Sequence, residues 1–228
     1  MPSSLRRPLA LALAAVVVVA LGVVAFFVNV GVHREVTPVS TADCQQAQFG
    51  PPLAPLDQPK NLRHYPSVPP MTIDVHRLYE ATITVPEGEI VVCLVPSWAP
   101  VTVNVFVTLA RNHFFDGLKW ARDPSTAPGG PVIQGGSPHD NLTGGPGFQF
   151  RSEPVNSPLY SKGAYQPGAV AMANAGANTN GSQFFITLAP FTLSPDYNLF
   201  GEVVSGLKVA QRVHRGDPMR ITVREQLP

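Results

Sequence analysis

The chain has 228 residues, of which 44% are hydrophobic, 16 are Lys or Arg and 15 are Asp or Glu, giving a formal net charge of +1. This length suits one domain of ordinary size with additional segments. The basic residues are scattered along the chain rather than clustered, which argues against nucleic-acid binding.

The first feature along the chain is an apolar stretch from Pro8 to Val32 that contains no charged residue. A helix of this length, at about 1.5 Å rise per residue, would cross a hydrocarbon core of about 30 Å. Arg6 and Arg7 precede the stretch, so the positive-inside rule predicts a short cytoplasmic end, a single-pass membrane anchor within residues 1–34 and an extracytoplasmic remainder. The alternative is a cleaved signal peptide, although this apolar run is longer than the roughly 7–15 residues of a signal peptide's apolar region.

The composition changes over residues 35–70, where prolines recur at short intervals. Proline disrupts helix interiors and the middle of sheets, and few apolar residues repeat here with a regular period. These residues are therefore predicted to form an extended, Pro-rich extracytoplasmic linker, and residues 71–228 to form the folded domain.

Strands dominate the predicted elements of that domain. Residues 79–85 and 89–95 are rich in β-branched side chains and are separated by a short Pro-Glu-Gly turn, which predicts a hairpin. Pro100 can begin a helix with one apolar face that ends near Asn112, a second helix is expected over 207–214, and a strand closes the chain at 219–225. This pattern favours an all-β dominated fold, a closed antiparallel β-barrel capped by two α-helices.

The two cysteines, Cys44 and Cys93, are candidates for a disulfide in a chain exported by its anchor. Such a bond would fasten the linker to a predicted strand. The alternative is that Cys93 is a small buried hydrophobic residue and Cys44 an exposed thiol.

Common catalytic patterns do not occur. The six histidines lack metal-ligand spacing, and the chain contains neither the G-x-S-x-G motif of serine hydrolases nor the Gly-Lys-Ser/Thr of a phosphate-binding loop. We therefore expect no metal and no cofactor.

Several longer motifs occur in a fixed order. They are Phe114-Phe115-Asp116-Gly117, Ile133-Gln134-Gly135-Gly136, GGPGFQF at 144–150, MANAGANTNGSQFFIT at 172–187 and FGEVV at 200–204. Over residues 79–223 the chain resembles the cyclophilin family of peptidyl-prolyl isomerases, and especially its membrane-anchored members from actinobacteria and similar bacteria. The resemblance implies an eight-stranded closed antiparallel β-barrel capped by two α-helices.

The resemblance also implies a substrate groove. It assigns catalytic roles to Arg122 and Gln134, and substrate contacts to Ala173, Asn174, Phe185, Leu193 and Tyr197, with Phe185 as the floor of the proline pocket. Outside these motifs, a single arginine would be read as a surface charge and a single phenylalanine as core packing.

The chain departs from the family pattern near Arg122. Ala121 stands where the family has histidine, Pro131 and Val132 replace a Phe-Met pair of the pocket, and a Pro- and Gly-rich insertion, DPSTAPGGP, occupies 123–131. Thr192 falls where cyclosporin-sensitive members carry Trp, so we expect weak cyclosporin binding.

Two functions are consistent with these features. The first is a prolyl isomerase that acts on X-Pro bonds of exported proteins and assists their folding outside the cytoplasmic membrane. The second is a catalytically weak or inactive peptide-binding module, a holdase or scaffold. Either one predicts unfolded or extended Pro-containing polypeptides as partners, attachment to the membrane through the N-terminal helix, no nucleic acid and a monomeric chain.

Overall fold

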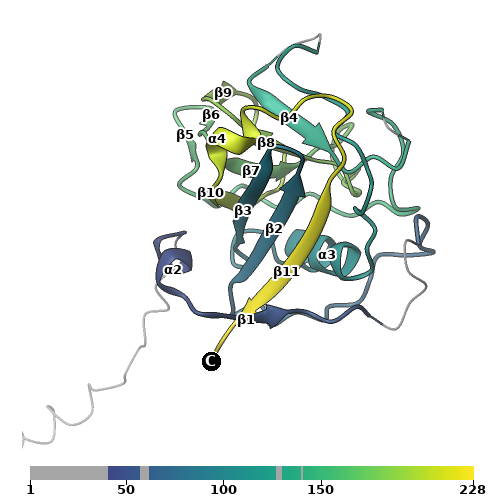
Figure 1. Ribbon diagram of the computed structural model, residues 1–228, viewed down its shortest axis with the longest axis vertical. Helices are drawn as coiled ribbons and strands as arrows, with labels where there is room; N and C mark the ends of the chain where they lie inside the picture. Colours follow the sequence, from purple (N-terminus) through teal and green to yellow (C-terminus); the bar gives the residue numbers. More distant parts are fainter. Residues whose placement is uncertain (1–40, 57–61, 127–129, 140) are drawn as a thin grey trace, which may run out of the picture. The chain divides into compact units, whose positions relative to one another are not determined.

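The computed structural model describes residues 41–56, 62–126, 130–139 and 141–228 (Figure 1), all of which belong to one compact unit. The predicted anchor within residues 1–34 lies outside the described residues. None of the helices in the described ranges has the length and apolar character needed to cross a membrane.

The fold is mostly β, as predicted. The main sheet contains β1 (Phe49–Pro52), β2 (Tyr79–Val85), β3 (Gly88–Leu94), β4 (Val132–Gly135), β7 (Ala169–Met172), β8 (Phe184–Thr187), β10 (Leu199–Ser205) and β11 (Arg220–Gln226). Their order is β1-β11-β2-β3-β10-β7-β8-β4, and all pairs are antiparallel. A small second sheet contains β5 (Tyr160–Ser161), β6 (Ala164–Tyr165) and β9 (Phe191–Thr192). The predicted hairpin is confirmed as β2 and β3, and the predicted closing strand as β11.

The predicted closure of the barrel is wrong in the described part of the chain, where no ladder joins the two outer strands, β1 and β4. Instead, two isolated bridges, Arg122 with Gln134 and Lys119 with Pro218, place the segment Lys119–Arg122 between β4 and the beginning of β11. Pro218 is a member of one bridge, and Pro124 and Pro131 lie close to the members of the other. Since proline has no N–H to donate, a continuous ladder cannot form there.

Both predicted helices are present and pack against the main sheet. The predicted helix at Pro100 is α3 (Pro100–Arg111), which lies against β11 and β10 (Figure 1). The second is α4 (Leu207–Ala210), shorter than predicted. Beyond it the Arg212 N–H donates to the Val209 carbonyl at 2.9 Å and the Val213 N–H to the Ala210 carbonyl at 3.3 Å. These three-residue spacings tighten the backbone and end the α-helix early.

The first turn of α3 is capped from a distant part of the sequence. Glu153 Oε1 accepts the Val101 N–H at 3.0 Å, and Glu153 Oε2 accepts the Thr102 N–H at 2.9 Å and the Thr102 hydroxyl at 2.7 Å. Glu153 is buried, so water cannot easily replace it. A carboxylate also interacts favourably with the positive end of the helix dipole.

We expect Glu153→Ala to lower the free energy of unfolding by about 2–4 kcal/mol, because it leaves the buried Thr102 N–H and the half-buried Val101 N–H of α3 without an acceptor. Chemical denaturation measures this change. Glu89→Ala, at an exposed position of β3, is the control and should change stability by less than about 0.5 kcal/mol. Equal stability of the two variants would contradict the capping role.

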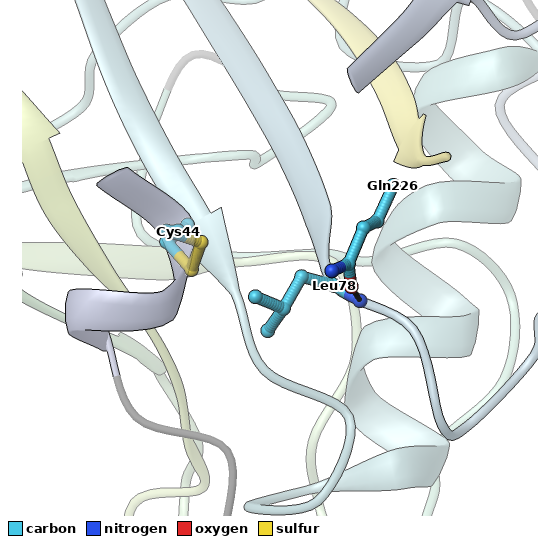
Figure 2. The surroundings of a disulfide bond; sticks show 4 residues. Cys44, Leu78 and Gln226 are labelled. Atoms are coloured by element: carbon cyan, nitrogen blue, oxygen red, sulfur yellow. Dashed lines mark hydrogen bonds between the residues drawn. A yellow bond between two sulfur atoms is a disulfide. The ribbon is translucent and has the colours of Figure 1, made fainter. Parts of the chain in front are cut away.

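Part of the predicted linker is folded onto the domain. Cys44, in α2 (Thr41–Gln46), forms a disulfide with Cys93 of β3, and Leu78 packs in the same buried cluster (Figure 2). β1 pairs with β11, and Tyr65 is buried. Prolines are compatible with β1 because it is an outer strand, where a missing N–H breaks no central ladder. The compact unit therefore includes residues that composition alone assigns to a linker.

Strand β8 explains how an apolar core and an apolar groove meet in one motif. Phe184 and Ile186 belong to the main core cluster, where the Phe184 ring lies 5.4 Å from that of Phe106, measured between centroids. Phe185 belongs to the other cluster. Because side chains alternate along a strand, the core residues on one face of β8 hold Phe185 rigidly on the opposite face.

Candidate active site

Nine residues line a cavity of about 290 Å³. They are Arg122, Val132, Gln134, Ala173, Asn174, Phe185, Phe191, Leu193 and Tyr197. All of them except Phe191 are among the site residues predicted from the sequence. Pro131, which is also predicted, does not line this cavity; its carbonyl accepts the Leu188 N–H at 2.7 Å and so extends the β4–β8 pairing.

Arg122 and Gln134 are held side by side by their own backbones. The Arg122 N–H donates to the Gln134 carbonyl at 3.1 Å, and the Gln134 N–H donates to the Arg122 carbonyl at 3.0 Å. Residues paired in this way project their side chains from the same face of a sheet. A guanidinium and an amide therefore lie at one edge of the cavity.

The Gln134 side chain is positioned by a second glutamine. Gln134 Nε2 donates to Gln183 Oε1 at 3.1 Å, and Gln183 Nε2 donates to the Gly144 carbonyl at 2.9 Å. Gln183 immediately precedes β8, so the motif that supplies Phe185 also orients the amide beside Arg122. With one donor group used internally, the Gln134 amide has a defined orientation toward the cavity.

Aromatic rings form the floor of the cavity. Phe185 is only 4% exposed, and its ring meets the Tyr197 ring edge-on at a centroid distance of 5.5 Å. Beneath them the Tyr165 hydroxyl donates to the Tyr197 carbonyl at 2.9 Å. Burial raises the pKa of Tyr165 above its usual value, so this hydroxyl stays neutral and keeps its proton for the bond. The floor is rigid, apolar and uncharged.

Phe191, on β9, is the cavity residue that motif-based reasoning missed. It supplies aromatic surface where Pro131 and Val132 replace the expected Phe-Met pair. A Cβ placed on Gly130 would lie 2.8 Å from the Phe191 ring and 3.2 Å from Arg122 Nη2, so the inserted segment passes close to both side chains. The available signal was the alternation of apolar Phe191 and Leu193 on either side of Thr192, since alternate residues of an extended segment point to the same side.

A larger cavity of about 670 Å³ adjoins the first, since Gln134, Ala173 and Asn174 line both. Small and polar residues make up most of its wall, within 142–149 and 173–183. The Asn174 side chain is engaged within the protein, because its Nδ2 donates to the Asp196 carbonyl at 2.9 Å and its Oδ1 accepts the Gly176 N–H at 3.2 Å. The two cavities together form a groove that is apolar at one end and polar at the other.

Within the described residues, one group could hold a metal ion. It comprises Glu87, His214 and Asp217, whose ligand atoms lie within 4.8 Å of one another in two turns; His214 is exposed and the other two are half-buried. None of the three lines either cavity. Spacing rules could not have found this group, because β2 and β11 bring the two turns together from opposite ends of the domain.

Comparisons with known proteins show which family this chain resembles. The family of cyclophilin-type peptidyl-prolyl cis-trans isomerases matches residues 80–226. Peptidyl-prolyl cis-trans isomerase B of Bacillus subtilis is 42% identical over 128 residues, which cover 56% of this chain and 84% of the relative. The probable isomerase B of Mycobacterium tuberculosis is 34% identical over 186 residues, covering 72% of this chain and 60% of the relative.

A solved structure agrees. The crystal structure of a Cryptosporidium parvum cyclophilin-type isomerase superimposes with a TM-score of 0.54, covering 66% of this chain and 99% of that protein. Because the two sequences are only 23% identical, this likeness establishes the fold alone. The family match over residues 80–226 and the identity to the Bacillus subtilis relative show that the chain belongs to the family of cyclophilin-type peptidyl-prolyl cis-trans isomerases.

Proposed function

We propose that this chain catalyses cis-trans isomerisation of X-Pro bonds in exported proteins and so assists their folding outside the cytoplasmic membrane. The observation that carries the proposal is the pairing of Arg122 with Gln134 at the edge of a cavity whose floor is Phe185. In this arrangement, Arg122 and Gln134 are the catalytic residues and the aromatic floor binds the proline ring.

The reaction needs no covalent intermediate. Rotation about an X-Pro bond must overcome a barrier of about 18–20 kcal/mol, because amide resonance is lost at the twisted transition state. There the proline nitrogen regains a lone pair and becomes a hydrogen-bond acceptor. A fixed guanidinium at Arg122 stabilises that nitrogen more strongly than it stabilises the planar amide, which lowers the barrier.

The groove suits an extended peptide. Phe185, Val132 and Phe191 give the proline ring an apolar surface, while the polar cavity beside it can accept the neighbouring residues. A related Cryptosporidium parvum isomerase, 24% identical, was crystallised in the presence of the dipeptide Ala-Pro. We therefore propose unfolded or extended Pro-containing chains as substrates.

Two features support a location outside the cytoplasmic membrane. The uncharged stretch Pro8–Val32 follows Arg6 and Arg7, which favours an anchor with a cytoplasmic N-terminus. The disulfide between Cys44 and Cys93 is typical of proteins that fold in an oxidising compartment. We propose a single-pass, monomeric membrane protein of the bacterial anchored type, with its isomerase domain outside the cell membrane.

Protease digestion of intact spheroplasts tests this topology. We expect external protease to degrade the domain, and a cytoplasmic control protein to survive. Protection of the domain until the membrane is lysed would contradict the location while leaving the isomerase activity itself untouched.

Phe191→Ala should raise KM for a proline peptide by about 10-fold with little change in kcat, because it removes apolar surface worth about 1–3 kcal/mol from the pocket. Steady-state kinetics at varied peptide concentration separates the two constants. The control is Thr192→Ala, at the exposed neighbouring position on β9. Unchanged KM for Phe191→Ala would show that Phe191 does not contact the substrate.

Thr192 also affects how strongly the groove is expected to bind the inhibitor cyclosporin. Since it takes the place of a tryptophan found in cyclosporin-sensitive members, we propose that cyclosporin binds this groove weakly. Titration of the protein with cyclosporin, before and after Thr192→Trp, measures the contribution of that position; equal affinity would contradict it.

A further inference from the structure

Asp123 directly follows Arg122 and belongs to the inserted segment rather than to any family motif. It is 6% exposed although it carries a carboxylate. Ionised carboxylates are rarely buried unless hydrogen bonds compensate for the lost water. The partners of Asp123 therefore indicate what the carboxylate does.

Three of those partners lie within the inserted segment. Asp123 Oδ1 accepts the Ser125 N–H at 2.9 Å, the Ser125 hydroxyl, and the Thr126 hydroxyl at 3.1 Å. The Asp123 N–H donates to Thr126 Oγ1 at 3.2 Å. These bonds close a compact turn immediately after Arg122. The Ser125 hydroxyl, followed by the Arg215 N–H, lowers the pKa of Asp123 to about 2, so its charge is present under all ordinary assay conditions.

The fourth partner is distant in sequence. Asp123 Oδ2 accepts the N–H of Arg215 at 2.9 Å, across 92 residues. Arg215 lies in the turn that precedes β11. The same turn forms two further hydrogen bonds with Trp120, which lies two residues before Arg122. The Gly216 N–H donates to the Trp120 carbonyl at 2.8 Å, and the Trp120 N–H donates to the Asp217 carbonyl at 2.9 Å.

Arg122 is thus held from two sides without belonging to a strand. On one side its backbone pairs with Gln134. On the other side, the Trp120 backbone and the Asp123 carboxylate bond to the turn at Arg215, so the chain is anchored both before and after Arg122. Asp123 is the first residue of the inserted segment and bonds directly to the turn at Arg215. Loss of its carboxylate therefore releases the C-terminal end of the segment Lys119–Arg122 from that turn.

We propose that Asp123 is a positioning residue for catalysis, which fixes the backbone and thereby the guanidinium direction of Arg122 by joining the inserted segment to the turn at Arg215. This inference rests on the catalytic role proposed for Arg122. A misplacement of a catalytic group by about 1 Å can cost up to about 100-fold in rate, so partial release of Arg122 should be visible in kcat.

The test compares Asp123→Ala, Asp123→Asn, Arg122→Ala and the double variant Arg122→Ala/Asp123→Ala in the full chain. We expect Asp123→Ala to lower kcat about 10-fold with KM within about twofold, because the aromatic floor is untouched. Asp123→Asn keeps one acceptor oxygen, so its kcat should fall less than that of Asp123→Ala. In the double variant, Asp123→Ala should lower kcat no further than Arg122→Ala alone does. The NMR signal of the Arg122 Nε–H should shift in Asp123→Ala, whereas that of Arg224 on β11 should not.

Other outcomes would overturn the proposal. If Asp123→Ala lowers the melting temperature but leaves kcat unchanged, the carboxylate only stabilises the loop. If its effect on kcat persists in the Arg122→Ala background, it does not act through Arg122. Full activity of Arg122→Ala would refute the role proposed for that arginine, whereas an inactive Arg122→Ala beside a fully active Asp123→Ala would refute the positioning alone. Should Asp123→Ala fail to fold, the same criteria apply to Asp123→Asn.

Discussion

Replacement of Arg122 by Ala is expected to lower kcat/KM for an Ala-Pro-Phe peptide by about 100-fold, the usual cost of removing one transition-state hydrogen-bond donor. Arg122→Lys should recover little, since an ammonium is a point charge without the planar, directed donors of a guanidinium. Peptide affinity should change far less than kcat, because Phe185 and Phe191 remain in place. Exchange spectroscopy and a binding titration measure the two quantities.

Arg224→Ala is the matched control for this experiment. Arg224 is exposed on β11, where its guanidinium lies 3.6 Å from the Glu80 carboxylate, and it lines neither cavity. Its removal should leave kcat/KM unchanged. If Arg122→Ala were as active as Arg224→Ala, the electrostatic role of Arg122 would be refuted.

Removal of the disulfide by Cys44→Ala/Cys93→Ala is expected to lower the free energy of unfolding by about 2–5 kcal/mol. The bond links residues 49 apart and fastens α2 to β3, so its loss gives the unfolded chain much more conformational freedom. Neither cysteine lines the groove. Activity at low temperature should therefore persist, while the midpoint of urea denaturation falls.

The control for this prediction is the unsubstituted protein in a strong thiol reductant under denaturing conditions, followed by refolding with the reductant present. It should unfold at the same urea concentration as the double variant, and alkylation should then detect two thiols. A double variant as stable as the oxidised protein would show that the bond contributes nothing to stability.

Elements with strong local patterns were predictable from the sequence. The alternation and β-branched character of β2 and β11, and the Pro100 start of α3, depend on neighbouring residues alone. Most of the groove was predictable for a different reason. Its residues lie in motifs whose spacing is unusual enough to identify the family, and the structure gathers eight of the nine predicted groove residues around one cavity.

Features that depend on distant partners were not predictable. The Pro-rich segment around Phe49–Pro52 lacks a strand pattern, and it becomes β1 because β11 offers an outer edge. Closure failed because the register at Pro218 and Arg122 leaves only isolated bridges. Phe191 reaches the cavity because β9 pairs with β6, and the bond from Arg215 to Asp123 joins residues 92 positions apart.

The most direct test of the proposed function is NMR exchange spectroscopy on an Ala-Pro-Phe peptide at equilibrium, with a catalytic amount of the full chain in a mild detergent. The groove built on Arg122, Gln134 and Phe185 predicts accelerated cis-trans exchange that disappears in Arg122→Ala. Exchange at the uncatalysed rate, with peptide resonances that nevertheless shift on binding, would contradict catalysis and assign the chain as a peptide-binding module.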